Sequence, residues 1–267
     1  MFLKPEHMKR ELSYVEAVRE ATDQEMARDP SVIVFGLDVD DPKAIQGTTR
    51  GLLEKYGSER VFGTPLSEDA MTGVAIGAAL AGLRPVHVHI RMDFLMLAMN
   101  QLINIAAKSR YMYGGQVQVP MVVRSMIGKS WGQGAQHSQG LYSFFMHVPG
   151  LKVVAPTTPY DAKGCLVQAI RDNDPVMYVE LRILHFQKGP VPESLYAVAP
   201  GKARITAPAA SGHDVSAWSF QELRWWRRPH GKERSVVVEN GGRGLPGAGP
   251  HEWDRLLGFV RRFFTWD

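Results

Sequence analysis

The sequence predicts an α/β fold in which a parallel sheet carries helices on both faces. Short apolar segments, typical of strands buried on both sides, recur up to about residue 180. Segments of helical length, either amphipathic or rich in small residues, separate them. Strands joined by helices of about ten or more residues pair in parallel, and the helices then cover both faces of the sheet.

The expected elements alternate along the chain. Leu12–Arg28 has apolar residues between charged ones at helical spacing, and Asp29-Pro30 ends this helix before the apolar strand Ser31–Gly36. Ser67–Ala81 begins with a capping serine and two acids, which favour a helix start, and continues with small residues. Further strands are expected at Pro85–Ile90, Val119–Arg124, Leu151–Ala155 and Val176–Leu181, and further helices at Met96–Tyr113 and Tyr160–Arg171.

The composition changes after about residue 200, which divides the chain into residues 10–200 and 201–267. Five of the six tryptophans lie in the last 50 residues, and Gly241–Pro250 (GGRGLPGAGP) breaks regular structure. Ser235–Val238 is the one apolar run that suggests a strand there. No convincing second domain follows from this segment.

The charge distribution argues against a nucleic-acid or membrane surface. Residues 1–200 carry 20 basic and 20 acidic residues, so the net charge of +4 comes from residues 201–267. The N-terminal residues contain no apolar stretch suited to a secretion signal, and we expect a cytoplasmic protein. The single cysteine, Cys165, excludes an intrachain disulfide and is expected to be inert packing.

Short motifs give weak functional signals. Gly128–Gly132 fits the G-x-S-x-G elbow of hydrolases around Ser130, but its glycine-rich continuation favours a loop over an active site. Gly242–Gly247 fits G-x-G-x-x-G, yet Pro246 prevents the helix that a dinucleotide site needs. His87 and His89 share one face of a strand at the spacing of two metal ligands. Without a third ligand, buried and hydrogen-bonded histidines are the better interpretation.

Glu68 and His137 are the residues best suited to acid–base chemistry. Glu68 follows a turn and lies among small residues, a setting that can desolvate a carboxylate for proton exchange with a weakly basic nitrogen. The alternative is an ordinary acid at a helix N-terminus. His137, between amides in a loop, is either an acid–base residue or a neighbour of a helix cap.

Several longer segments, all in one order over about residues 10–205, resemble the β subunit of thiamine-diphosphate-dependent 2-oxo acid dehydrogenases, the E1β component, including acetoin dehydrogenase β. The matching segments are GTPLSEDAMTGVAIGAALAGLRPV (63–86), NQLINIAAKSRYMYGG (100–115), GAQHSQ (134–139), PGLKVVAPTTPYDAKG (149–164) and AIRDNDPV (169–176).

The resemblance implies a transketolase-like pyrimidine-binding domain and assigns roles to four residues. Glu68 would share a proton with N1′ of the cofactor's aminopyrimidine and so promote loss of the thiazolium C2 proton. Phe94 would stack on the pyrimidine ring, and His137 would lie near the substrate or an incoming lipoyl group. Asp38 keeps the second acid of the family's Gly-Glu-Asp/Glu-Val segment and is assigned to cofactor binding, whereas Leu37 replaces the first acid.

The resemblance also implies ions and partners. A structural potassium ion is bound in some members by a loop that matches Ala169, Ile170, Asp172 and Asp174, with Met121 on the neighbouring strand. This chain shows no GDG…N motif for Mg²⁺ and diphosphate, which the family carries on its α subunit. The active unit would be an α₂β₂ heterotetramer that passes an acyl group to lipoyl-E2.

The chain departs from the family in two regions. Gly128–Gly134 (GKSWGQG) differs from the corresponding loop of pyruvate and acetoin enzymes, which leaves the substrate open. The match fades after about Ser219, so residues 220–267 are either a frameshift product or a divergent tail. Besides the E1β function, a split carboligase or decarboxylase that uses no E2 and a truncated, non-catalytic subunit remain as alternatives.

Overall fold

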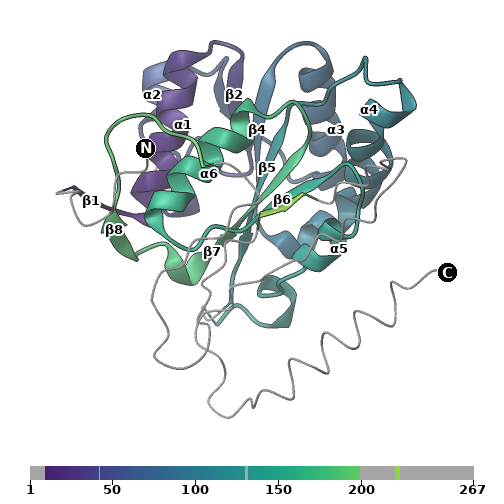
Figure 1. Cartoon of the computed structure of the whole chain (residues 1–267). Coiled ribbons are helices and arrows are strands. Elements are labelled where there is room, and N and C mark those ends of the chain that lie inside the picture. The colour runs from purple at the N-terminus through teal and green to yellow at the C-terminus, as the bar shows by residue number, and fades with distance from the viewer. Residues whose placement is uncertain (1–9, 42, 130–131, 199–219, 223–267) are drawn as a thin grey trace, which may run out of the picture.

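Six parallel strands form the centre of the fold, in the order β3-β2-β4-β5-β7-β6 (Figure 1). A seventh strand, β9, pairs antiparallel with β6 at one edge. This computed structural model describes residues 10–198, apart from 42, 130 and 131, together with 220–222. The strands are β2 (Val32–Gly36), β3 (Val61–Gly63), β4 (Arg84–His89), β5 (Val122–Ile127), β6 (Lys152–Val154), β7 (Val176–Leu181) and β9 (Phe220–Glu222).

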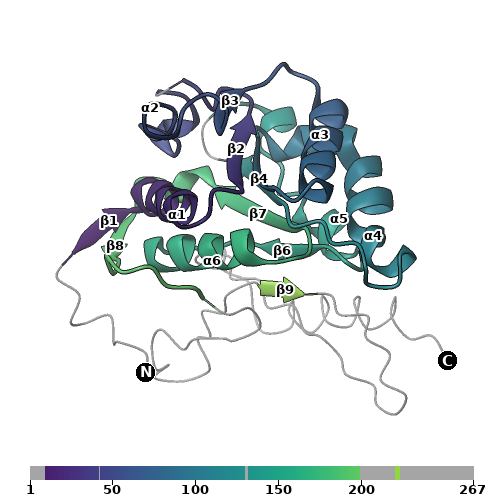
Figure 2. The ribbon, with the colours of Figure 1, turned by 90° about the horizontal axis from the view of Figure 1, so that it is seen from above.

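Helices cover both faces of the sheet, as Figure 2 shows. One face packs against α1 and α6, and the other against α3, α4 and α5. A separate two-stranded antiparallel sheet joins β1 to β8. The helices and these strands are β1 (Glu11–Ser13), α1 (Tyr14–Arg28), α2 (Leu52–Tyr56), α3 (Glu68–Leu80), α4 (Ala107–Met112), α5 (Tyr142–Met146), α6 (Pro159–Arg171) and β8 (Lys188–Pro190).

Strand β2 shows why a continuous apolar run forms a central strand. All five of its residues are buried, and successive side chains point to opposite faces of the sheet. Val32 and Val34 therefore join the core beneath α1 and α6, whereas Ile33 and Phe35 join the core beneath α3 and α4. The alternation places one hydrophobic layer on each side of the sheet.

Local signals fix where the two helices of one face begin. Ser13 caps α1 in a capping box: its hydroxyl accepts from the Glu16 backbone, and the Glu16 carboxylate accepts from the Ser13 backbone at 2.7 Å. The Thr158 hydroxyl caps α6 by accepting from the Asp161 backbone N–H, and Pro159 takes the first helical position, where a missing N–H costs nothing.

The parallel sheet and its helical layers confirm the predicted fold class. The expected helix Met96–Tyr113 is wrong in detail, because the chain forms a 3₁₀ helix (Met92–Ala98), then a π-helical turn (Gln101–Ala106), and only then α4. The expected strand Val119–Arg124 begins three residues later, at Val122. The predicted strand Ser235–Val238, the motif Gly242–Gly247 and the division at residue 200 lie outside the described residues.

Within the described part of the chain, no helix combines the length and the apolar character that crossing a bilayer requires.

Candidate functional site

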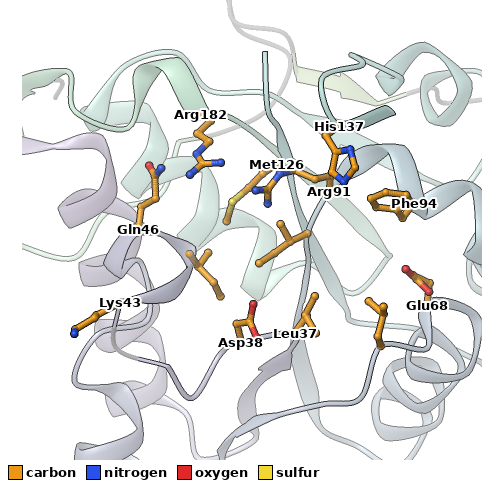
Figure 3. A pocket seen from close by; sticks show the side chains of 13 residues that line it. Leu37, Asp38, Lys43, Gln46, Glu68, Arg91, Phe94, Met126, His137 and Arg182 are labelled. Atoms are coloured by element: carbon orange, nitrogen blue, oxygen red, sulfur yellow. The ribbon is translucent and has the colours of Figure 1, made fainter. Parts of the chain in front are cut away.

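A cavity of about 530 Å³ opens at the carboxyl ends of the parallel strands (Figure 3). Leu37 and Asp38 reach it directly after β2, Ile90 and Arg91 directly after β4, and Met126 from the end of β5. Ligands of open parallel sheets bind at this edge, because loops that follow several strands converge there. The fold therefore assembles one site from segments that lie far apart in the sequence.

All four residues that the sequence assigns to cofactor or substrate line this cavity: Asp38, Glu68, Phe94 and His137. Glu68 is the first residue of α3 and is half-buried. The rings of Phe94 and His137 meet edge to face, with centroids 5.1 Å apart and planes at 78°. Ser67 takes the cap position of α3, as expected, but its side chain makes no capping hydrogen bond.

Two arginines in the same cavity were not identified as site residues from the sequence. Arg91 and Arg182 are both half-buried, and Figure 3 shows them on the side of the cavity opposite Glu68 and Asp38. Burial lowers the pKa of Arg91, and the charge of Arg182 lowers it further. Their position immediately after β4 and β7 was the available signal, since residues at this edge of a parallel sheet face the ligand site.

A buried polar cluster lies behind the Arg182 side of the cavity. Arg124 Nε donates to Glu180 Oε1 at 2.7 Å, and His185 Nε2 lies 3.6 Å from Glu180 Oε2; all three side chains are fully buried. Burial alone would raise the pKa of Glu180, but the charge and hydrogen bond of Arg124 and the nearby His185 outweigh it, and the pKa is lowered. Glu180 is therefore held as a carboxylate inside the core.

His87 and His89 lie beneath the site as a neighbouring pair. Their ring centroids are 5.8 Å apart, and both side chains are buried. Burial lowers the pKa of His87 to about 4, and burial together with His87 lowers that of His89 to about 3. Both imidazoles are neutral near pH 7. The described residues contain no group of three or more His, Cys, Asp or Glu side chains placed to hold a metal ion.

In the loop expected to bind potassium, the backbone carbonyl groups already accept hydrogen bonds. Arg84 donates to the carbonyls of Ile170 at 3.0 Å and Asp172 at 2.9 Å. The Ala169 carbonyl accepts from the Asp172 backbone, and that of Met121 accepts from the backbone of β7. A guanidinium on two of these oxygens would repel a further cation, so the residues fit a metal ion poorly.

The carboxylates of the same loop pair with basic side chains. Lys152 Nζ lies 2.8 Å from both carboxylate oxygens of Asp172 and 3.4 Å from Asp174. Asp174 also pairs with Arg110. These contacts tie β6 and the end of α4 to the loop before β7, which is a structural role.

Other sequence candidates fall beside the site or outside the described residues. Cys165 is buried on α6 within the core, as expected of packing. Ser130, the nucleophile of the G-x-S-x-G interpretation, and Trp131 lie outside the described residues.

A parallel α/β domain whose strand ends bring together a carboxylate, an aromatic ring and a histidine has the architecture of a cofactor-binding enzyme domain. The chain belongs to the family of the transketolase pyrimidine-binding domain, whose sequence profile matches residues 10–186.

Relatives share this part of the chain at substantial identity. The β subunit of acetoin:2,6-dichlorophenolindophenol oxidoreductase from Cupriavidus necator is 48% identical over 223 residues, which cover 80% of this chain and 65% of that protein. The mitochondrial pyruvate dehydrogenase E1 component subunit beta-1 of Arabidopsis thaliana is 43% identical over 218 residues, covering 80% and 59%. The chain thus spans about 59–65% of the length of these relatives.

Solved structures agree on the fold. A split-gene transketolase, described as an inactive β4 tetramer, superposes with a TM-score of 0.55 at 20% identity, covering 73% of this chain and 58% of that chain. Transketolase from Leishmania mexicana gives a TM-score of 0.51 at 15% identity, covering 63% and 25%.

Proposed function

We propose that the chain is the β-type subunit of a thiamine-diphosphate-dependent E1 enzyme that decarboxylates a 2-oxo acid or cleaves acetoin. The observation that carries the proposal is the convergence of Glu68, Phe94 and His137 on one cavity, although 69 positions separate the first from the last. The relatives named for pyruvate dehydrogenase E1 and for acetoin oxidoreductase support the same assignment.

The residues present fit an aminopyrimidine ring. Glu68 offers a half-buried carboxylate that can share a proton with a ring nitrogen, and Phe94, on the same side of the cavity, offers a flat apolar surface for stacking (Figure 3). The apolar side chains of Leu37, Leu66 and Ile90 also line the cavity. Thiamine diphosphate, when bound, supplies the carbon nucleophile that attacks the substrate carbonyl.

His137 would act on the substrate side. Its ring packs against Phe94, so a ring stacked on Phe94 would bring the reacting atoms close to the imidazole. An imidazole in this position can donate a proton to, or accept one from, an oxygen of the substrate or a sulfur of a lipoyl group.

The proposed enzyme needs a partner subunit. This sequence shows no GDG…N motif for Mg²⁺ and diphosphate, so an α-type subunit would hold that half of the cofactor in an α₂β₂ assembly. Lipoyl-E2 would accept the acyl group, and neither nucleic acid nor membrane takes part. The cytoplasm is the expected location.

Purification of the tagged chain from its source cells tests the assignment. We expect an α-type subunit carrying GDG…N to co-elute, with thiamine diphosphate bound. A co-eluting lipoyl protein supports transfer to E2, whereas activity without one favours a split carboligase or decarboxylase. A chain that elutes alone and without thiamine diphosphate contradicts the proposal and favours a non-catalytic subunit.

A further inference from the structure

The cavity has a cationic side that the proposed cofactor contacts do not use. Arg91 and Arg182 come from the loops after β4 and β7, and Met126 forms the apolar surface between them in Figure 3. Asp38 and Glu68 lie across the cavity. The two guanidinium groups are close enough that the charge of Arg182 lowers the pKa of Arg91. Their mutual repulsion favours an anion between them.

A neutral amide orients each guanidinium. Arg91 Nε donates to Gln133 Oε1 at 3.0 Å. The amide orientation that satisfies all partners of Gln46 lets its oxygen accept from Arg182 Nε at 2.6 Å and from a terminal nitrogen at 2.8 Å. The Gln133 amide fixes the direction of the Arg91 guanidinium without neutralising it. Among the described residues, no carboxylate lies within ion-pair distance of Arg91.

The support for Arg182 is anchored in the core. In the same orientation the Gln46 nitrogen donates to His185 Nδ1 at 2.7 Å, and His185 is fully buried next to Glu180. Gln46 has φ 54°, and the preceding Ile45 has φ 50°, a left-handed backbone that a β-branched residue rarely adopts. Backbone strain of this kind persists where the surrounding structure fixes it, and here it accompanies the orientation of the Gln46 side chain toward Arg182 and His185.

Gln133, the support for Arg91, lies in the glycine-rich segment Gly128–Gly134, the part of the site whose sequence departs from the pyruvate and acetoin enzymes. A guanidinium held by one amide keeps further N–H groups for a carboxylate or phosphate, which it can bind through two parallel hydrogen bonds.

We propose that Arg91 and Arg182 bind an anionic group of the substrate, a carboxylate or a phosphate, and select charged substrates over neutral hydroxyketones. This inference rests on the function proposed above and adds the substrate class. Arg91 and Arg182 act as specificity residues, while Glu68 and Phe94 hold the cofactor.

Binding to the intact purified chain tests the proposal without turnover. The probes are pyruvate, its uncharged methyl ester, acetoin and inorganic phosphate, with affinities measured by calorimetry. We expect pyruvate to bind at least about tenfold more tightly than the ester or acetoin, because only pyruvate offers a charge-assisted contact. Competition by phosphate distinguishes a site for any oxyanion from one shaped for a carboxylate. Equal affinity for pyruvate and its ester, including no detectable binding of either, overturns the proposal.

Variants assign the effect to the two arginines. Arg91→Gln and Arg182→Gln should each weaken pyruvate binding about tenfold or more and leave the affinity of the ester unchanged. Arg91→Lys should recover only part of the loss, because an ammonium group lacks the guanidinium fork. Lys188→Gln, at an exposed position on β8, removes the same charge far from the cavity and should bind pyruvate normally. Circular dichroism checks the fold of each variant.

Cofactor binding separates this proposal from the proposed function. Thiamine and thiamine diphosphate should bind the two Gln variants as they bind the wild-type chain. A selective loss of thiamine diphosphate affinity would assign the arginines to the cofactor's diphosphate and overturn the substrate proposal. Failure of Glu68→Gln to change thiamine affinity counts against the proposed function and leaves the pyruvate result standing.

Discussion

The ring of Phe94 meets the ring of His137 edge to face inside the cavity, with centroids 5.1 Å apart. Phe94 follows β4 in one 3₁₀ helix, whereas His137 is the last residue of another, Ala135–His137, after β5. Their contact joins the expected cofactor-stacking residue to the expected acid–base residue. A change at Phe94 should therefore affect both cofactor affinity and the position of the imidazole.

Phe94→Ala should weaken binding of thiamine diphosphate about 5- to 100-fold, the range expected when one stacked aromatic contact is lost. Phe94→Tyr keeps the ring and should bind nearly as the wild type does. Calorimetric titration of the intact complex measures both. Unchanged affinity in the alanine variant would remove Phe94 from the cofactor site.

Stability should fall as the pH drops below the ordinary pKa of histidine, about 6.5. The folded chain holds His87 and His89 neutral, with pKa values of about 4 and about 3, whereas the unfolded chain binds protons at both. Their contribution to stability is complete above about pH 6.5 and is lost as the pH falls toward 4, at about 1.4 kcal/mol per pH unit for each histidine.

Urea unfolding between about pH 7 and about pH 5 measures this slope. His89→Phe removes one titrating group and should remove about half of the decline. An identical slope in the variant would mean that His89 is protonated in the folded chain or titrates with an ordinary pKa.

Glu180→Gln should destabilise the fold by about 3–5 kcal/mol, because it leaves Arg124 as an uncompensated charge in the core. Lys55 forms an ion pair with Asp23, and its side chain is 53% exposed. Lys55→Gln breaks this surface pair and should lower the free energy of unfolding by no more than about 1 kcal/mol. Chemical denaturation of the two variants gives the comparison. Equal losses would show that the Arg124–Glu180 pair contributes no more than a surface pair.

Gly36→Ala should prevent correct folding near the site. A Cβ atom at Gly36, which has φ +150°, would lie 2.0 Å from the Val88 carbonyl oxygen, so β2 and β4 would have to separate. Gly82→Ala also has positive φ, but nothing lies within 4 Å of the added atom, and the cost should be about 1 kcal/mol. Thermal unfolding compares them, and a Gly36→Ala variant as stable as Gly82→Ala would contradict this packing.

Local sequence patterns were sufficient to predict the central strands and the three long helices α1, α3 and α6, because each forms a run with one clear pattern. The segment 92–112 was harder, since the tighter and wider helical turns before α4 depend on packing against α3 rather than on residue spacing. The short strands β1, β3 and β8 have only three residues each and leave almost no pattern. Antiparallel pairing of β9 with β6 is a tertiary contact without a local signal.

Some residues of the site could likewise be predicted from the sequence, and others could not. The TP-x-S-E and AQHSQ segments resemble family motifs, so Glu68 and His137 could be named from the sequence. Arg91, Arg182 and Gln46 belong to no such motif, and only the meeting of three loops at the sheet edge shows that they share a cavity. The loop expected to bind potassium contains the matching residues, but its cationic neighbours Arg84 and Lys152 come from other strands.

The most direct test of the central claim is the rate at which the C2 proton of thiamine diphosphate exchanges with deuterium in the complex purified from source cells. This rate reports the acid–base role of Glu68 without requiring the substrate. We predict that the wild-type complex accelerates exchange at least about 100-fold over the free cofactor, and that Glu68→Ala abolishes most of the acceleration with little effect on folding. Asp69→Ala, at an exposed acid in the same helical turn, should exchange as the wild type does. Exchange at the wild-type rate in Glu68→Ala would contradict the account.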